Sequence, residues 1–305
     1  MKIAGVQPLN TRLLLEKALS YYELTKPGIT YMVLGSMMMG FILAPVAGIS
    51  YLTLFHAIIG TYAIAAGTAA HNQFIERHLD RLMNRTRKRP LPANKVTPHE
   101  ANRFSLILIF GGLAYLLAFV NWKAGLVSAA TTLLYLGAYT PMKRVSAWNV
   151  VVGAIPGALP PVGGWMAAGG SFSDIGMWLL FAIVFFWQIP HVMSIAWVCL
   201  DDYSNAGFTM VPKNDSQGTK TAWAMLINLI ALLPIVYAVF HIGLGYWLFL
   251  ILSGLATLAF TVFGVMFLIQ RTKKSAKFVM FGSFIYLPVV WIALFADILV
   301  FSYLF

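Results

Sequence analysis

Long runs of apolar residues, separated by short polar or charged segments, dominate the pattern of this chain. A helix that crosses the hydrocarbon core of a bilayer needs about 20 mostly apolar residues, and many of these runs are that long. Breaks at charges, glycine and proline divide the chain into nine predicted spans, at residues 30–49, 52–70, 103–120, 123–140, 147–168, 174–194, 222–241, 244–269 and 279–302. The pattern therefore predicts an all-α polytopic membrane protein.

Composition and charge agree with that prediction. Hydrophobic residues make up 60% and charged residues 10% of the 305 positions, whereas roughly a quarter of a soluble domain is charged. The net charge of +11 could suggest a nucleic-acid partner, but all 21 basic residues except Lys123 fall on alternate connections. The positive-inside rule assigns those connections to the cytoplasm. We therefore expect no nucleic-acid binding, and a bacterial cytoplasmic membrane protein with its N-terminus inside and its C-terminus outside.

The domain organisation is simple. Residues 1–29 are predicted to form an amphipathic N-terminal segment on the cytoplasmic surface of the membrane, and residues 30–305 are predicted to form a single domain. Cys199 is the one cysteine of the sequence, which excludes an internal disulfide and a multi-cysteine metal site. Its simplest interpretation is a small packed side chain.

A densely charged stretch, HNQFIERHLDRLMNRTRKRP, follows the second predicted span. Asn72, Glu76 and Asp80 recur every four residues in it, which places them on one face of a helix. Carboxylate and amide oxygens are the ligands that Mg²⁺ prefers, and nearby arginines such as Arg85 and Arg89 can grip phosphate oxygens. The stretch thus indicates either a metal-bridged polyphosphate site or a solvated face with exposed ion pairs.

A second acidic cluster favours the first interpretation. Asp201, Asp202 and Tyr203 follow the sixth predicted span, with Lys213 and Lys220 close behind. Four predicted spans separate this cluster from the first one, so both return to the same side of the membrane. We therefore expect the two acidic clusters to meet over one cytoplasmic mouth.

The stretch NQFIERHLDRLMNRTRKRPLP resembles the first signature of the UbiA superfamily of intramembrane prenyltransferases, and specifically its protoheme IX farnesyltransferase branch. That branch reads N-x-x-x-E/D-x-x-x-D-x-x-M-x-R-T-x-x-R-P. The matching positions are Asn72, Glu76, Asp80, Met83, Arg85, Thr86, Arg89 and Pro90. Eight matched positions make the similarity specific.

Other segments are similar to the same branch. They are YTPMKR with the following NVVVGAIPGALPPVGGW, then FFWQIPHVMSIAW, then DDYSNAGFTMVP, and TKPGIT at the start of the first predicted span. The positions in these segments that match motif residues of the branch include Tyr139, Lys143, Arg144, Asn149, His191, Asp202 and Tyr203. The branch usually has a basic residue just before its D-Y pair, where this chain has none at residues 198–200, so Asp202 is a safer match than Asp201.

The resemblance implies a UbiA-type helical bundle around a central cavity that opens toward the cytoplasm. It implies an enzyme that transfers farnesyl from farnesyl diphosphate to a vinyl group of heme b, with addition of water, to give heme O. Asn72, Glu76 and Asp80 would hold one Mg²⁺ through the diphosphate, and Asp202 would hold a second. Further catalytic positions are Arg85, Arg89, Tyr139 and Lys143, and substrate-binding positions are Arg144, Asn149, His191 and Tyr203. Besides the lipid bilayer, a heme A synthase or the assembly of a terminal oxidase is an expected partner.

Some roles stay open at this stage. Lys143 and Arg144 could bind either diphosphate or heme propionates. His191 could contact the heme iron or a propionate, or could instead bond the carbonyl that Pro190 frees. Aromatic faces stabilise a carbocation, and the candidate aromatic residues for the cavity lining are Phe74, Tyr135, Tyr139 and Trp187. The alternative for each is packing or a place in the interfacial aromatic belt, and the family match favours Tyr139 as a lining residue.

Two alternative functions also remain. Another UbiA-type prenyltransferase, acting on an aromatic acid, a quinone precursor or chlorophyllide, would keep both acidic clusters but need not keep M-x-R-T-x-x-R-P or W-Q-x-P-H. A non-enzymatic transporter or heme-binding membrane protein would explain the spans and the charge asymmetry, but it gives no reason for two acidic clusters on one side.

Overall fold

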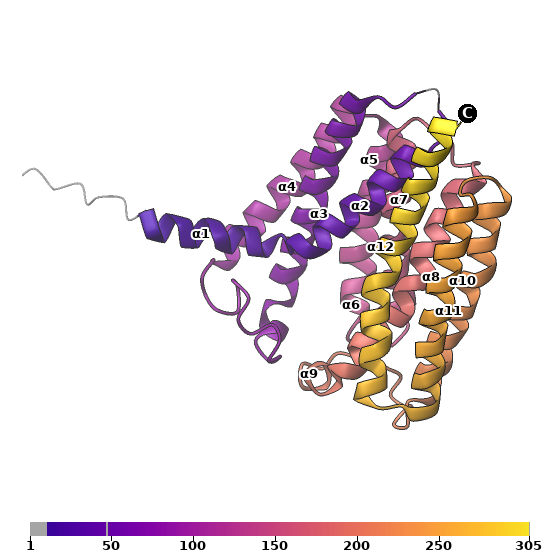
Figure 1. The fold of residues 1–305 in the computed structure, drawn as a ribbon. Helices are drawn as coiled ribbons and strands as arrows, with labels where there is room; N and C mark the ends of the chain where they lie inside the picture. The colour runs from indigo at the N-terminus through magenta and orange to yellow at the C-terminus, as the bar shows by residue number, and fades with distance from the viewer. Residues whose placement is uncertain (1–10, 47, 305) are drawn as a thin grey trace, which may run out of the picture.

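The computed structural model describes residues 11–46 and 48–304, and these residues form helices and connections without any strand. Figure 1 shows long helices packed side by side, with α1 projecting from the bundle. The helices are α1 (Thr11–Leu24), α2 (Pro27–Leu43), α3 (Tyr51–Asp80), α4 (Pro98–Phe119), α5 (Trp122–Leu133), η1 (Leu134–Tyr139), α6 (Thr140–Met142), α7 (Asn149–Ala167), α8 (Ile175–Val198), α9 (Leu200–Asn205), α10 (Thr219–His241), α11 (Trp247–Gln270) and α12 (Lys273–Leu304). Residues 1–10 of the predicted amphipathic segment lie outside the described residues.

The predicted count of nine spans is not confirmed. Within the described ranges, seven helices are long and apolar enough to cross a membrane, and an eighth is obtained if α1 and α2, which meet at a 49° bend, count as one span. The predicted span 123–140 coincides with three consecutive pieces, α5, η1 and α6. Hydropathy detects the apolar run but does not report the change from α-helix to π-helix inside it.

The joint between α1 and α2 has a defined backbone cause. Lys26 adopts a left-handed conformation, with φ 48° and ψ 62°, which is uncommon for a residue with a Cβ atom. Pro27 then opens α2, where its missing N–H and fixed φ suit the first helical position. The predicted domain boundary at residue 30 therefore lies three residues inside a continuous helix.

Helix α7 packs at the centre of the bundle against α2, α5 and α8. Glycines make two of its contacts with α2 unusually close: a Cβ atom on Gly40 would lie 1.9 Å from the carbonyl oxygen of Pro161, and one on Gly164 would lie 1.8 Å from that of Met37. Small residues permit such backbone approach in membrane bundles. The close approach of α2 and α7 thus requires glycine at positions 40 and 164.

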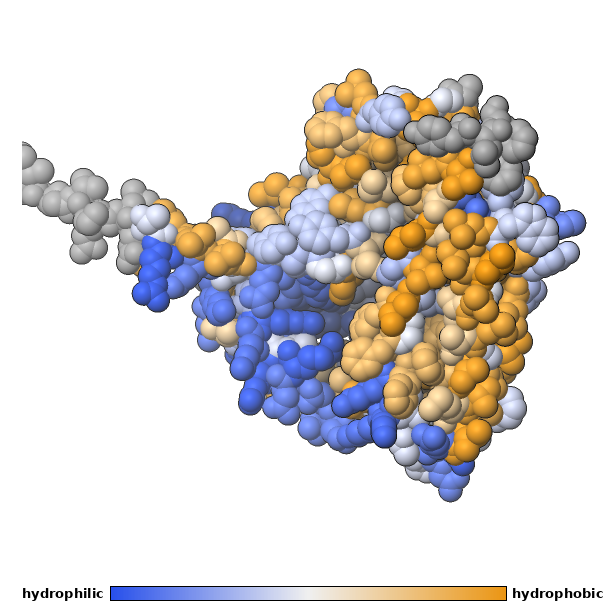
Figure 2. Space-filling view, viewed as in Figure 1, coloured by the Kyte–Doolittle hydropathy of each residue, from blue (hydrophilic) through white to orange (hydrophobic). Residues whose placement is uncertain are grey.

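A cavity of about 610 Å³ lies among α2, α3, α5, η1, α7, α8 and α12, within the usual size range of small-molecule sites. Its polar lining residues include Lys26, Tyr135, Tyr139 and His191, and most of the remaining lining is apolar. Figure 2 shows hydrophilic surface gathered over the connection between α3 and α4, beside a largely hydrophobic bundle. The exposed basic residues of that connection include Arg81, Arg85, Arg87 and Lys88.

Candidate active site

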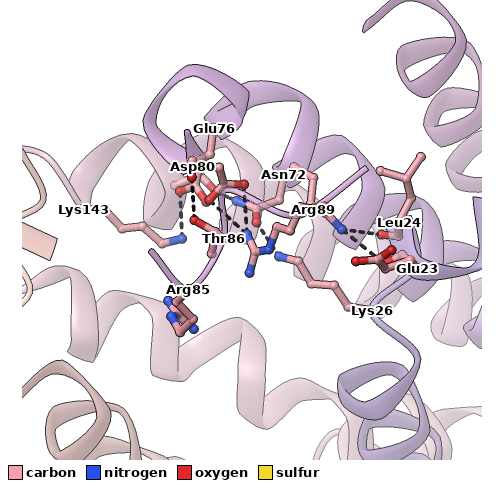
Figure 3. A network of polar contacts seen from close by, with 12 residues as sticks. Glu23, Leu24, Lys26, Asn72, Glu76, Asp80, Arg85, Thr86, Arg89 and Lys143 are labelled. Carbon is pink, nitrogen blue, oxygen red and sulfur yellow. Dashed lines mark hydrogen bonds and ion pairs between the residues drawn. The ribbon is translucent and has the colours of Figure 1, made fainter. Parts of the chain in front are cut away.

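The last turns of α3 carry a row of buried polar side chains. Asn72 is 0% exposed, Glu76 5% and Asp80 0%, and all three lie on one face of the helix, as their spacing predicts. A buried carboxylate is costly unless it is paired and hydrogen-bonded. Each member of this row is met by a cationic side chain from a different segment of the chain (Figure 3).

The three pairings are close. Arg89 donates from Nη1 to both carboxylate oxygens of Asp80, at 3.0 and 2.9 Å. Lys143 donates from Nζ to Oε1 of Glu76 at 2.8 Å, and Lys26 donates from Nζ to Oδ1 of Asn72 at 2.8 Å. Two carboxylates and one amide therefore face three basic side chains inside the bundle.

The connection after α3 folds back onto the row because of its own motif residues. Thr86 donates from Oγ1 to the carbonyl oxygen of Asp80 at 2.8 Å and is buried. Met83 is buried in the main hydrophobic core. These two contacts return the chain toward α3, which brings Arg89 to Asp80. The M-x-R-T-x-x-R-P motif thus includes residues that shape the connection as well as charges for a ligand.

Lys26 belongs to the site but was not among the predicted site residues. Gln73, which is buried beside Asn72, donates to the carbonyl oxygens of Leu24 at 2.9 Å and Glu23 at 3.4 Å. Those bonds satisfy free carbonyls at the end of α1 and fix the joint from which Lys26 extends (Figure 3). The available sequence signal was the Lys-Pro pair at the start of the first apolar run.

The second acidic motif meets the first one, as expected. Asp202 accepts hydrogen bonds from the backbone N–H of Asn84 at 3.3 Å and from that of Arg85 at 3.2 Å, and from the Asn84 side chain at 3.3 Å. Arg85 donates to the Tyr203 hydroxyl at 2.9 Å and lies over its ring. Asp201 instead pairs with Lys273, and its side chain is 80% exposed.

The remaining predicted residues lie outside the row of acids. Tyr139 lines the cavity, and Nζ of Lys143 lies 4.6 Å from the centre of its ring. Asn149 is buried and donates to the carbonyl oxygens of Ser146 and Thr209, so it anchors the start of α7. Arg144 is exposed.

The predicted aromatic lining is partly wrong. Tyr135, Tyr139 and Trp187 line the cavity. Phe74 packs instead in a small cluster around Leu24 and beneath the guanidinium of Arg77. Phe74 lies two residues from Asn72 on α3, and positions two apart on a helix point to different faces.

The site has the ligand types for Mg²⁺ and phosphate. Within the described part of the chain, no group of three or more His, Cys, Asp or Glu side chains is already arranged around a metal position. The acids are held by cations instead, although Asn72, Glu76 and Asp80 are hard oxygen donors of the kind that Mg²⁺ takes together with substrate phosphates. A magnesium diphosphate could satisfy both sets at once, with its metal facing the oxygens and its phosphates facing the cations.

Comparison with known proteins identifies the family. Residues 33–285 match the model of the UbiA prenyltransferase family. The chain is 41% identical over 280 residues to a protoheme IX farnesyltransferase of Solibacter usitatus, covering 89% of this chain and 96% of that protein.

Two solved structures share the fold. A digeranylgeranylglyceryl phosphate synthase superimposes with a TM-score of 0.77 at 18% identity, over 92% of this chain and 98% of that chain. A UbiA homolog from Archaeoglobus fulgidus, bound to GPP and Mg²⁺, superimposes with a TM-score of 0.62 at 14% identity, over 90% and 99% of the two chains. The extent of the sequence match and the arrangement of the helices together show that this chain belongs to the UbiA prenyltransferase family.

Proposed function

We propose that this protein transfers the farnesyl group of farnesyl diphosphate to a vinyl group of heme b, giving heme O and diphosphate. The observation that carries the proposal is the buried row of Asn72, Glu76 and Asp80, in which each oxygen ligand has its own cation. Its position beside an apolar cavity fits a substrate with a charged head and a long apolar tail. The similarity to a protoheme IX farnesyltransferase supports the choice of heme as acceptor.

When the donor binds, the row of oxygen ligands and the basic side chains exchange one another for the metal and the diphosphate. Asn72, Glu76, Asp80 and Asp202 would hold Mg²⁺, which when bound neutralises the negative charge that develops on the departing diphosphate. Lys26, Arg89 and Lys143, released from their present partners, turn to the phosphate oxygens. Charge-assisted hydrogen bonds from these groups are the strong ones. The chain thereby stabilises the leaving group with cations that it already holds in place.

Farnesyl transfer exchanges a carbon–oxygen bond of the donor for a carbon–carbon bond to the acceptor. The bond between C1 of farnesyl and the diphosphate oxygen breaks, and its electron pair leaves with diphosphate. The π electrons of the heme vinyl group form a new bond from its terminal carbon to C1, which leaves a cation on the vinyl carbon next to the porphyrin. Water adds its oxygen to that carbon and gives up one proton, for which the released diphosphate is an available base, and the product is heme O.

The cavity protects the allylic cation that develops at C1 of farnesyl as diphosphate leaves. Bulk water would capture an allylic cation before the vinyl group attacks, so exclusion of solvent belongs to the mechanism. The rings of Tyr135 and Tyr139 lie 5.2 Å apart between their centres and both line the cavity. Aromatic faces stabilise a cation by about 0.5–2 kcal/mol each, and the Tyr139 ring lies beside the charged row through its contact with Lys143.

We place the protein in a bacterial inner membrane, with the charged connection after α3 in the cytoplasm. That connection contains exposed basic residues, and hydrophilic surface gathers over it (Figure 2). Lys123, whose Nζ donates to the Gly170 carbonyl oxygen at 3.2 Å, then lies outside. Labelling from the cytoplasm of a cysteine at position 123 or 171 should fail, and efficient labelling there would contradict this orientation.

The reaction can be tested with membranes that contain the full chain, supplied with heme b, farnesyl diphosphate and Mg²⁺. Chromatography and mass spectrometry of the extracted hemes should find heme carrying farnesyl plus water, and none with Asp80→Ala. If the wild type modifies no heme but prenylates an aromatic or quinone-precursor acceptor under the same conditions, the acceptor is wrong and the metal-diphosphate site stands.

A further inference from the structure

His191 lies on the wall of the cavity, in α8, and its ring is held in one orientation. Trp187, one turn earlier, stacks on it with the ring centres 5.0 Å apart and the planes 13° from parallel. Phe284 of α12 meets it edge-on at 5.2 Å. The Trp187 indole donates from Nε1 to the carbonyl oxygen of Ser283 at 2.8 Å, which fixes the stacking partner as well. The imidazole is therefore preorganised.

The hydrogen bonds of Ser283 determine which ring nitrogen carries the proton. The Ser283 hydroxyl has one hydrogen, and it donates this hydrogen to the carbonyl oxygen of Met280 at 2.5 Å. Its oxygen must then accept from Nδ1 of His191, 2.7 Å away. An imidazole facing an apolar cavity is neutral, because an unpaired buried cation is costly. Nε2 consequently has no proton and carries a free lone pair.

Nε2 is left free by this arrangement. Among the hydrogen bonds of the described residues, the imidazole of His191 takes part in one, which runs through Nδ1 to Ser283. The buried side-chain nitrogen and oxygen atoms that lack a partner in this part of the chain belong to Gln73, Asn149, Ser253 and Trp291. Nε2 is therefore unpartnered but not enclosed by protein, and His191 is partly buried and lines the cavity. The sequence had left open a bond from His191 to the backbone carbonyl that Pro190 frees. The structure shows a different bond, because Nδ1 pairs with the Ser283 hydroxyl and so joins α8 to α12.

We propose that Nε2 of His191 ligates the iron of the heme acceptor inside the cavity. This inference rests on the proposed function, and iron here is part of the substrate. Neutral imidazole is a good ligand for iron. A ligating histidine almost always donates its other N–H to an oxygen acceptor, which is the arrangement of His191 and Ser283. Met32 and Met37 also line the cavity and offer competing thioether sulfurs.

Ligation would make the iron a determinant of acceptor choice. It would hold the porphyrin at a fixed point on the cavity wall, so that one vinyl group can be presented repeatedly to the allylic carbon. Metal-free protoporphyrin IX has the same vinyl groups and propionates but no iron. It should therefore bind without any contribution from His191.

The test is a titration of hemin into the purified full chain, followed by optical absorption and electron paramagnetic resonance. We expect a nitrogen-ligated iron signature in the wild type. His191→Ala should lose this signature and bind hemin about 10- to 100-fold more weakly, and added imidazole should restore the signature. Ser283→Ala should weaken hemin binding by about 10-fold. Metal-free protoporphyrin IX should bind the wild type and His191→Ala equally.

The chain offers a matched control. His71 of α3 also bonds through Nδ1 to a serine, Ser105, at 3.0 Å, and that serine likewise donates to a backbone carbonyl. His71 does not line the described cavity, so His71→Ala should leave the hemin signature unchanged. His191→Gln, which keeps a polar side chain, serves if the alanine variant does not fold.

Each outcome decides the inference separately from the proposed function. A wild-type spectrum without a nitrogen ligand overturns the iron ligation whatever the variants do, and so does an unchanged spectrum in His191→Ala. If His191→Ala weakens the binding of hemin and of metal-free protoporphyrin IX equally, His191 is a packing residue, and the iron ligation is again overturned. Farnesylation of heme by the same wild-type preparation is measured alongside. Turnover without ligation rejects the inference alone, and ligation without turnover rejects the proposed function alone.

Discussion

The two acidic motifs meet at one site but are held in different ways. Glu76 and Asp80 of the first motif are buried and paired with the cationic side chains of Lys143 and Arg89. Asp202 of the second motif is half-buried and is held by the backbone N–H groups of the connection after α3. The first motif therefore pairs its charges with side chains that a ligand can replace, whereas Asp202 of the second motif also joins two segments of the chain.

This difference bears on the energy of binding. The attraction between two buried charges offsets their loss of hydration only if the geometry is good and all hydrogen bonds are made. Removal of one partner leaves the other as an unpaired buried charge. A metal diphosphate that replaces both partners at once avoids that penalty. A metal without phosphate, or phosphate without a metal, would leave one set of charges unpaired. The first motif should thus be more sensitive to substitution than the second.

The largest effect is expected for Asp80→Asn. It removes a carboxylate that is 0% exposed and leaves Arg89 without its bidentate partner. We expect the rate of farnesyl transfer to fall about 10²–10³-fold, the scale of losing one electrostatic group in a dry site. The matched control is Asp215→Asn, since Asp215 is a buried carboxylate that caps the start of α10 through the N–H groups of Lys220 and Thr221. The control should lower the thermal midpoint and keep the activity.

An intermediate effect is expected for Asp202→Asn. Loss of one carboxylate at the half-buried motif should reduce activity about 10- to 100-fold, because it removes one charge-assisted interaction worth about 1.5–3 kcal/mol. Asp201→Asn is the control in the same turn, and its side chain pairs with Lys273 at the surface. Exposed pairs contribute little, so this variant should stay close to the wild type. Equal losses in both variants would reject the distinction between Asp201 and Asp202.

The smallest effect is expected for Lys26→Met. The substitution keeps most of the length of the side chain but removes the ammonium group that contacts Asn72. KM for farnesyl diphosphate should rise about 10-fold, as for loss of a single charge-assisted hydrogen bond. Steady-state kinetics at saturating heme measures the change. An unchanged KM would exclude Lys26 from the diphosphate site.

The sequence was informative where a side-chain pattern reports geometry directly. Four-residue spacing placed Asn72, Glu76 and Asp80 on one helical face, and the burial of that face agrees. The meeting of the two acidic motifs followed from counting connections, and the bonds between Asp202 and residues 84 and 85 agree with it. Both inferences use regular periodicity, which is the strongest signal that a single sequence carries.

The sequence was less informative where the backbone departs from regularity. Lys26 reaches Asn72 because of a left-handed residue at a helix joint, and no periodicity predicts that conformation. The π-helical turn of η1 brings Tyr135 and Tyr139 to the cavity wall and also breaks the fourth predicted span into pieces. Turns of this kind often occur at functional sites, so the irregular segments hold part of the site that pattern analysis misses.

The mechanism requires metal and diphosphate to bind together, by exchanging partners with the buried row. Thermal unfolding of the purified chain measures this joint binding, with Mg²⁺ alone, with farnesyl diphosphate and a chelator, and with both ligands. Because a ligand that binds the folded state raises stability by mass action, we expect the rise in Tm with both ligands to exceed the sum of the separate rises. That excess should disappear in Asp80→Asn. An equal rise for farnesyl diphosphate with and without Mg²⁺ would show that the two ligands bind independently and would reject the exchange of partners.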